Sequence, residues 1–149
     1  MVQMTPLHRK SKESDYFQIV PPKKLPATGA WKATSLYVRL LSKGICFTCG
    51  AKLPMNKLVA GHFREKIGGS ATYFDLDNLR CQCSWNCNRQ KHGAKDIYAK
   101  KLIDEIGKRR FDDLFIKGQK AKQWTKGELE ELADIREKMC EEILAKYKI

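Results

Sequence analysis

The chain has 149 residues, and its 29 lysines and arginines against 17 acidic residues give a formal net charge of +12. This length is typical of one domain with a modest core, and the charge favours a polyanionic partner such as nucleic acid, with solubility alone as the alternative. The sequence has no apolar run of membrane-spanning length and no secretory signal pattern, so we expect a cytoplasmic protein without membrane contact.

Three segments are expected along the chain. The first is rich in proline, lysine and polar side chains, which predicts an extended basic arm. The middle segment contains five of the six cysteines, and in a reducing compartment metal ligation is a better interpretation than disulfides. The boundaries are 1–30 for the basic arm, 31–107 for the core with its flanking helices, and 108–149 for a C-terminal helical segment.

Helices and short strands are predicted in the first part of the core. Residues 31–43 place apolar side chains at helical spacing, and Gly44 is positioned to end this helix. The stretch KLVAGHF, residues 57–63, is apolar and β-branched as in a strand, and the Gly-Gly pair at 68–69 indicates a turn. A further helix is expected to begin near Asn88.

Two later helices are also predicted. The stretch KDIYAKKLIDEIG has Ile97, Leu102 and Ile106 near helical spacing and ends at Gly107. The last helix begins at a capping box formed by Thr125 and Glu128. Its apolar stripe suggests a homodimer seam, with packing onto the chain's own core as the alternative. The residues of this stripe are Leu129, Leu132, Ile135, Met139, Ile143 and Tyr147.

Two close cysteine pairs, CFTC and CSWNC, lie far apart in the sequence. Each short loop can deliver two thiolates to one tetrahedral ion, while the intervening chain forms a lobe. We therefore predict a structural zinc site, with free buried cysteines as the alternative. Cys81 competes with Cys83 as a ligand, and Cys140 is expected to be packed in a helix. The predicted ligands are Cys46, Cys49, Cys83 and Cys87.

Between and after these cysteines, the motifs AGHFRE, DNLRCQC and CNRQKHG carry His62, Asn78 and Asn88 in this order. The arrangement resembles HNH endonucleases of the ββα-metal class. Together with CFTCG and YAKKLIDEIG, it resembles the phage NinG/Rap recombination family over about residues 33–116. The resemblance implies an α+β fold, in which a small zinc-stabilised ββα-metal (HNH) core is flanked by N- and C-terminal helices.

The resemblance also implies three catalytic roles. His62 would be the general base, because a neutral imidazole can take a proton from water near neutral pH. The amide of Asn78 would tie a loop and orient the histidine. Asn88 would hold a catalytic Mg²⁺ or Mn²⁺ ion through its carbonyl oxygen, and this cation would neutralise the phosphate and the leaving oxygen.

The sequence departs from the HNH pattern at Gly61, where many of these enzymes have a metal ligand directly before the base. Water, phosphate and a neighbour such as Asp75 or Asp77 are therefore expected to assist Asn88. His92 is expected four residues along the same helix face as a further ligand, with DNA contact or simple exposure as the alternative. The candidate DNA contacts, each of which could instead be solvated surface, are Arg64, Lys66, Arg89 and Lys91.

The function implied by the resemblance is a metal-dependent, structure-specific DNA endonuclease that leaves a 3′ hydroxyl and a 5′ phosphate. Its expected substrates are branched intermediates of phage recombination, such as Holliday junctions and displacement loops, in the cytoplasm of the host cell. One alternative is a non-catalytic zinc module that binds DNA or a partner. Another is an HNH homing or restriction nuclease, which has the same chemistry but recognises a sequence.

Overall fold

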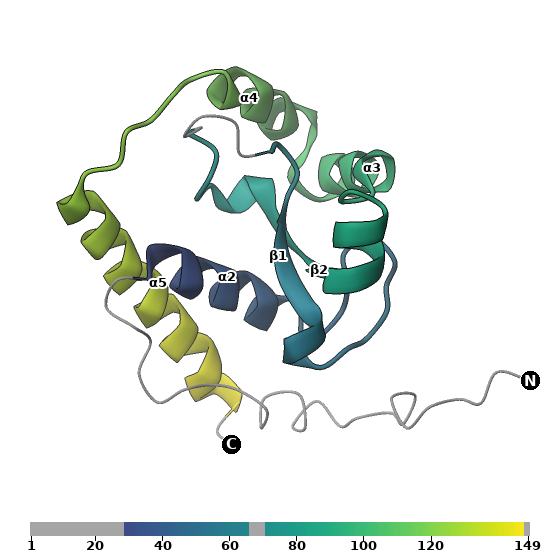
Figure 1. Ribbon diagram of the computed structural model, residues 1–149, viewed down its shortest axis with the longest axis horizontal. Helices are drawn as coiled ribbons and strands as arrows, with labels where there is room; N and C mark the ends of the chain where they lie inside the picture. The colour runs from purple at the N-terminus through teal and green to yellow at the C-terminus, as the bar shows by residue number, and fades with distance from the viewer. Residues whose placement is uncertain (1–28, 66–70, 148–149) are drawn as a thin grey trace, which may run out of the picture.

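The computed structural model describes residues 29–65 and 71–147, which form an α+β fold around a small antiparallel hairpin (Figure 1). The α+β class expected from the sequence is confirmed. The described elements are α2 (Ala30–Leu41), η2 (Met55–Lys57), β1 (Leu58–His62), η3 (Leu76–Asn78), β2 (Leu79–Cys83), η4 (Ser84–Gln90), α3 (Lys95–Ile106), α4 (Lys108–Gly118) and α5 (Lys126–Tyr147). The expected basic arm up to residue 28 and the turn at 68–69 lie outside the described residues.

The hairpin places the candidate site residues next to one another. Strands β1 and β2 are antiparallel, with a register that runs from Leu58 opposite Cys83 to His62 opposite Leu79. Leu58 and Leu79 are both buried, as expected where strand pairing follows the apolar pattern. At the far end, the backbone N–H of Phe63 donates to the carbonyl of Asn78 at 2.9 Å. The register therefore brings the predicted histidine and the predicted central asparagine together.

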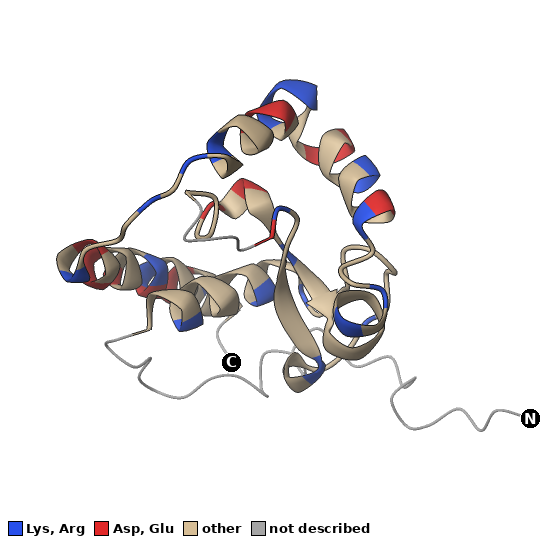
Figure 2. Ribbon diagram, turned by 45° about the horizontal axis from the view of Figure 1, so that its top comes forward, with Lys and Arg blue, Asp and Glu red and all other residues tan. Residues whose placement is uncertain are grey.

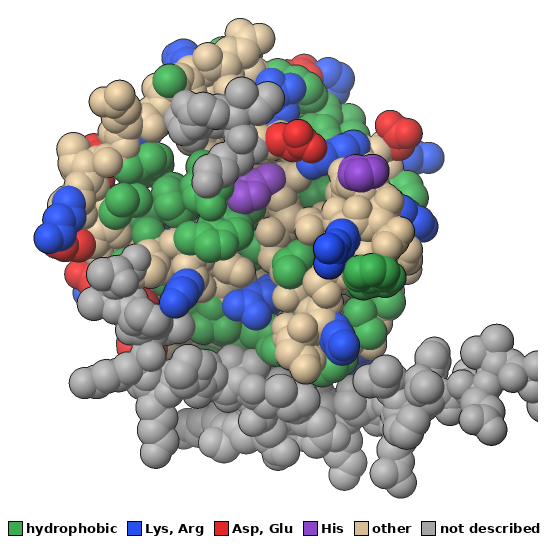
Figure 3. Space-filling model, viewed as in Figure 1, with side chains coloured by type: hydrophobic (Ala, Val, Ile, Leu, Met, Phe, Trp, Pro, Cys, Tyr) green, Lys and Arg blue, Asp and Glu red, His purple; other side chains and the backbone are tan. Residues whose placement is uncertain are grey.

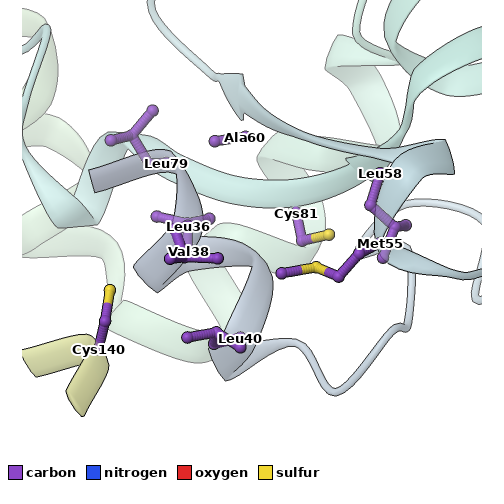
Figure 4. Packing of buried hydrophobic residues seen from close by; sticks show 9 residues of the cluster. All are labelled: Leu36, Val38, Leu40, Met55, Leu58, Ala60, Leu79, Cys81 and Cys140. Carbon is purple, nitrogen blue, oxygen red and sulfur yellow. The ribbon is translucent and has the colours of Figure 1, made fainter. Parts of the chain in front are cut away.

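The main hydrophobic core lies between this hairpin and α2 (Figure 4). Helix α2 contributes Leu36, Val38 and Leu40, all of which are buried. It ends as predicted, because Lys43 and Gly44 take positive φ values of 53° and 85° that a continuing α-helix does not allow. The other buried members of this cluster are Met55, Leu58, Ala60, Leu79, Cys81 and Cys140.

A second core joins α3 and α4 to the opposite side of the site. Tyr98 and Leu102 are buried one helical turn apart, with Phe111 and Leu114 from α4 packed against them. Gly107, with φ of 87°, separates the two helices, which confirms the predicted end of α3. Ile97 is 46% exposed, because Tyr98 faces the hairpin and its neighbour in the helix therefore faces solvent.

Helix α5 packs along α2 within the same chain (Figure 1). Its capping box is confirmed, since the N–H of Thr125 donates to the Glu128 carboxylate at 3.0 Å and the N–H of Glu128 donates to the Thr125 hydroxyl at 3.1 Å. Most of the apolar stripe packs inward, although Ile135 is 48% exposed. The structure thus shows the alternative of packing onto the chain's own core.

Charged residues are concentrated on the helices α3, α4 and α5. Both acidic and basic residues occur on α3, α4 and α5 (Figure 2). Within the described part of the chain, no helix combines the length and the apolar character needed to cross a membrane.

Candidate metal centre and nuclease site

The four predicted cysteines form one cluster, and their Sγ atoms all lie within 4.8 Å of one another. The Sγ atoms of Cys49 and Cys83 are 3.8 Å apart. Four thiolates at about 2.3 Å from a tetrahedral zinc ion would be separated by about 3.8 Å, so the donor set fits a metal such as zinc. The backbone N–H of Cys87 donates to Cys83 Sγ at 3.2 Å, which fixes the second pair at the start of η4.

The electrostatics of the cluster also favour a bound cation. Burial raises the pKa of the Cys46 thiol, but hydrogen bonds to Thr48 and to backbone groups outweigh it and bring this pKa down to about 6. Burial and the nearby sulfurs raise the pKa of the Cys87 thiol to about 12, although a hydrogen bond with Thr48 partly opposes this rise. Four closely spaced sulfurs cannot all ionise without a compensating charge, and a divalent metal ion would supply it.

The other two described cysteines lie outside the cluster. Cys81 belongs to the apolar core under α2, and burial raises its pKa to about 11. Cys140 is buried in α5, where its thiol donates to the carbonyl of Ala33 at 3.5 Å. The predicted choice of Cys83 over Cys81, and the packed position of Cys140, agree with this geometry.

His62 lies at the end of β1, where its ring forms a mutually contacting cluster with two aromatic rings. Its imidazole stacks on Trp31 and Tyr73, with ring centroids at 5.0 Å and 4.8 Å. Its Nε2 lies 2.9 Å from the carbonyl oxygen of Tyr73, and a carbonyl can only accept. The neutral ring therefore carries its proton on Nε2 and its lone pair on Nδ1. This arrangement fixes both the plane and the tautomer of the candidate base.

Asn78 closes the loop that joins the two strands. Its side chain has 0% exposure. Its Oδ1 accepts from the N–H of Arg64 at 2.7 Å, while Nδ2 donates to the carbonyls of Arg64 and Thr72, both at 3.1 Å. One buried amide thus satisfies three backbone groups on both sides of the loop, which accords with the predicted tying role.

Two residues of α3 that sequence reasoning missed hold the end of β1 in place. Lys95 Nζ donates to the carbonyl of His62 and, at 2.8 Å, to that of Phe63. The Tyr98 hydroxyl donates to the carbonyl of Gly61 at 2.8 Å. Burial lowers the pKa of Lys95. Neither residue stands out in the sequence, because a lysine at a helix start is common and a helical tyrosine resembles ordinary core.

Asn88 lies in η4 with its side chain against the hairpin. Its Nδ2 donates to Gln82 Oε1 through a long hydrogen bond of 3.4 Å. A Cβ placed on Gly61 would lie 3.2 Å from Asn88 Nδ2 and 2.2 Å from Gln82 Oε1. The Asn88 amide is therefore adjacent to the residue directly before His62. Gln82 is a site residue that the sequence reasoning did not single out.

The expected helix beginning near Asn88 and containing His92 is wrong in both extent and position. The π-helical segment η4 runs from Ser84 to Gln90, and α3 begins separately at Lys95. Between them, His92 has a φ of 49°, and the N–H of Gly93 donates to the carbonyl of Cys87 at 2.8 Å. This turn folds back on the cysteine cluster, so the exposed His92 does not share a helix face with Asn88.

Asp75 and Asp77, expected to help at the cation site, are bound to α4. Asp75 accepts from the N–H of Asp77 at 3.0 Å and forms an ion pair with Lys117 at 2.7 Å. Asp77 forms an ion pair with Arg110. These contacts hold η3 against α4, and neither carboxylate is among the contacts described for Asn88.

The predicted DNA contacts lie on different parts of the surface. Arg64 stacks over the Phe115 ring of α4, with Cζ 4.6 Å from the centroid. Arg89 lies 5.3 Å from the ring centroid of Trp85, which is 62% exposed on η4. Lys91 is exposed, and Lys66 lies outside the described residues. Figure 3 shows lysine and arginine side chains around histidines on one face of the molecule.

These features define a small α+β protein with a four-cysteine cluster that could hold a metal ion and a hairpin followed by a helical turn. The family model for the Bacteriophage Lambda NinG protein matches residues 9–146. The chain belongs to the NinG family, which confirms the resemblance of its motifs to the NinG/Rap family. No curated protein and no solved structure matches the chain.

Proposed function

We propose that the chain is a metal-dependent, structure-specific DNA endonuclease of the HNH type that cleaves branched intermediates of phage recombination. The observation that carries this proposal is the position of the Asn88 amide against Gly61, directly beside His62 in the hairpin. The candidate cation ligand, Asn88, therefore lies next to the residue that directly precedes the candidate base in β1. Family membership supports the phage setting, and Holliday junctions and displacement loops are the proposed substrates.

His62 is the proposed general base. Stacking on Trp31 and Tyr73 holds the ring, and the bond from Nε2 to the Tyr73 carbonyl leaves Nδ1 as the proton acceptor. This nitrogen would take a proton from water, and the resulting hydroxide would attack the phosphorus atom and break its bond to the 3′ oxygen, which leaves and is protonated. The products are a 5′ phosphate and a 3′ hydroxyl. Lys95 and Asn78 keep the end of the strand in place while this happens.

Asn88 is the proposed protein ligand of a catalytic Mg²⁺ or Mn²⁺ ion. A carbonyl oxygen suits a hard cation, and the half-buried position of Asn88 leaves part of its side chain accessible. When bound, such an ion neutralises the scissile phosphate and the leaving oxygen. Gly61 supplies no side-chain ligand, so water and the phosphate itself would fill the remaining positions.

The DNA-binding surface is proposed to include the part of the outer face of η4 that carries Trp85 and Arg89. The net charge of +12 favours contact with the phosphate backbone. Trp85 and Arg89 offer a cation beside an exposed ring, which suits a base that has lost its stacking partner at a branch. Arg64 and Lys91 are further proposed phosphate contacts. Cutting a junction symmetrically needs two sites, so we propose that two copies act together in the host cytoplasm.

A cleavage assay on linear, forked and four-way DNA with Mg²⁺ or Mn²⁺ tests the proposal. Wild-type protein should cut branched DNA in preference to linear duplex. His62→Ala should abolish cleavage and leave junction binding intact, because the imidazole carries the proton transfer and little of the affinity. Binding without cleavage by the wild type would instead favour a non-catalytic zinc module. Cleavage of linear DNA at one sequence would favour a homing or restriction nuclease.

A further inference from the structure

Gln82 is a polar side chain in β2 with 0% exposure. A buried amide is costly unless its donors and acceptor are paired. Its Nε2 lies 3.1 Å from the Thr48 hydroxyl oxygen and 2.8 Å from the carbonyl oxygen of Gly93. The Gly93 carbonyl can only accept, so the nitrogen must face this side. The oxygen of Gln82 consequently faces the opposite side, toward Asn88.

This orientation of Gln82 determines how Asn88 is presented. Gln82 Oε1 accepts from Asn88 Nδ2 at 3.4 Å. The nitrogen and oxygen of a planar amide point in different directions, so a nitrogen held toward Gln82 turns the Asn88 carbonyl oxygen away from the hairpin. If the Asn88 amide rotated by half a turn, its N–H groups would face the cation position and could not bind a positive ion.

Gly61 makes room for this contact. Gln82 Oε1 lies 2.2 Å from the place that a Cβ on Gly61 would occupy, far inside a normal contact distance. Any side chain at position 61 would therefore displace the amide of Gln82. Position 61 is where the resemblance to HNH enzymes leads one to expect a metal ligand. In this chain, a side chain from the neighbouring strand fills that space instead.

The same amide connects the candidate cation site to the cysteine cluster. Thr48 is buried at 5% exposure, and its Oγ1 lies 3.4 Å from Cys46 Sγ. Polar contacts thus run from Cys46 through Thr48 and Gln82 to Asn88. A metal bound by the cysteines would hold the first of these contacts in place, so the two sites share one rigid support.

We propose that Gln82 is a positioning residue that directs the Asn88 carbonyl oxygen toward the catalytic cation. Its complete burial argues against Gln82 being a cation ligand, so it acts through Asn88. The inference rests on the proposed function, because it requires a cation at Asn88.

Gln82→Met tests the inference, because methionine has a similar length but cannot replace these hydrogen bonds. Gln90→Met, at an exposed glutamine of the adjacent η4, is the matched control. Mn²⁺ binding by paramagnetic resonance and the Mg²⁺ dependence of junction cleavage are the two measurements. For Gln82→Met we expect Mn²⁺ affinity to fall and the half-saturating Mg²⁺ concentration to rise by about 10-fold or more, with zinc content and junction affinity retained. The control should match the wild type.

Two further variants keep the test decisive if Gln82→Met folds poorly. Thr48→Val removes the hydroxyl that fixes Gln82 and should weaken Mn²⁺ binding, whereas Thr48→Ser should not. Unchanged Mn²⁺ binding and Mg²⁺ dependence in folded Gln82→Met, or equal Mn²⁺ affinity in the two Thr48 variants, would overturn the inference and leave the nuclease proposal standing. If wild-type protein neither binds Mn²⁺ nor cleaves DNA, the proposed function fails and the inference fails with it.

Discussion

The cysteine cluster and the candidate cation site are neighbours, but they differ in how completely the protein encloses them. The cluster is enclosed by four protein sulfurs within 4.8 Å of one another, and all but Cys49 are buried. The cation site offers one half-buried amide, Asn88, backed by the fully buried Gln82. A structural metal is held best by a complete set of protein ligands, whereas a catalytic ion needs open positions for water and substrate. Under the proposed function, the chain would separate stability from chemistry.

The largest expected effect comes from opening the enclosed site. Cys49→Ala removes one of the four ligands, and in small metal sites the free energy of metal binding, about 10–16 kcal/mol, is largely folding free energy. We expect loss of zinc and loss of cooperative thermal unfolding, measured by metal analysis and calorimetry. Cys140→Ala is the control, since it should retain zinc and lose only about 1 kcal/mol of stability. Folded Cys49→Ala protein without metal would contradict a structural role.

A second effect should be confined to the open site. Asn88→Ala removes the proposed ligand but no cysteine, so the protein should fold and retain zinc. Turnover of four-way DNA should fall by about 100-fold or more, because the cation that stabilises transition-state charge is no longer held. Asn88→Asp keeps an oxygen and should retain some metal-dependent activity.

Asn86→Ala, at an exposed position of the same η4, is the matched control for the loss of an asparagine side chain. It should cleave at the wild-type rate. Equal rates for Asn88→Ala and Asn86→Ala would show that η4 is scaffold only.

The smallest expected effect concerns the outer face of η4, which belongs to neither metal site. Trp85→Ala removes an exposed ring that touches no cysteine ligand in the described contacts, so zinc content and unfolding temperature should not change. Junction affinity in a gel-shift titration should fall by about 10-fold, in line with the loss of about 1–3 kcal/mol per stacked base. Trp85→Phe should retain most of the affinity. An unchanged dissociation constant for Trp85→Ala would remove this face from the DNA surface.

Several elements of the fold were predictable because their signals are local. Gly44 and Gly107 end helices through positive φ values, and the capping box of Thr125 and Glu128 begins another helix. The four-cysteine cluster was predictable because the close pairing of its cysteines in the sequence is itself the signal. The helix expected from Asn88 through His92 was wrong, since the turn after η4 is imposed by contacts with the cysteine cluster rather than by helix propensity.

The sequence by itself determined the candidate residues: the four cysteines that could hold a metal, and the order of His62, Asn78 and Asn88 that resembles the NinG family. Tertiary structure alone decided how they are oriented. The tautomer of His62 follows from the carbonyl of Tyr73, and the direction of the Asn88 amide follows from Gln82. Both depend on hydrogen bonds that form only once the chain has folded back on itself, and no helix or strand pattern encodes which buried partner an imidazole or an amide will meet.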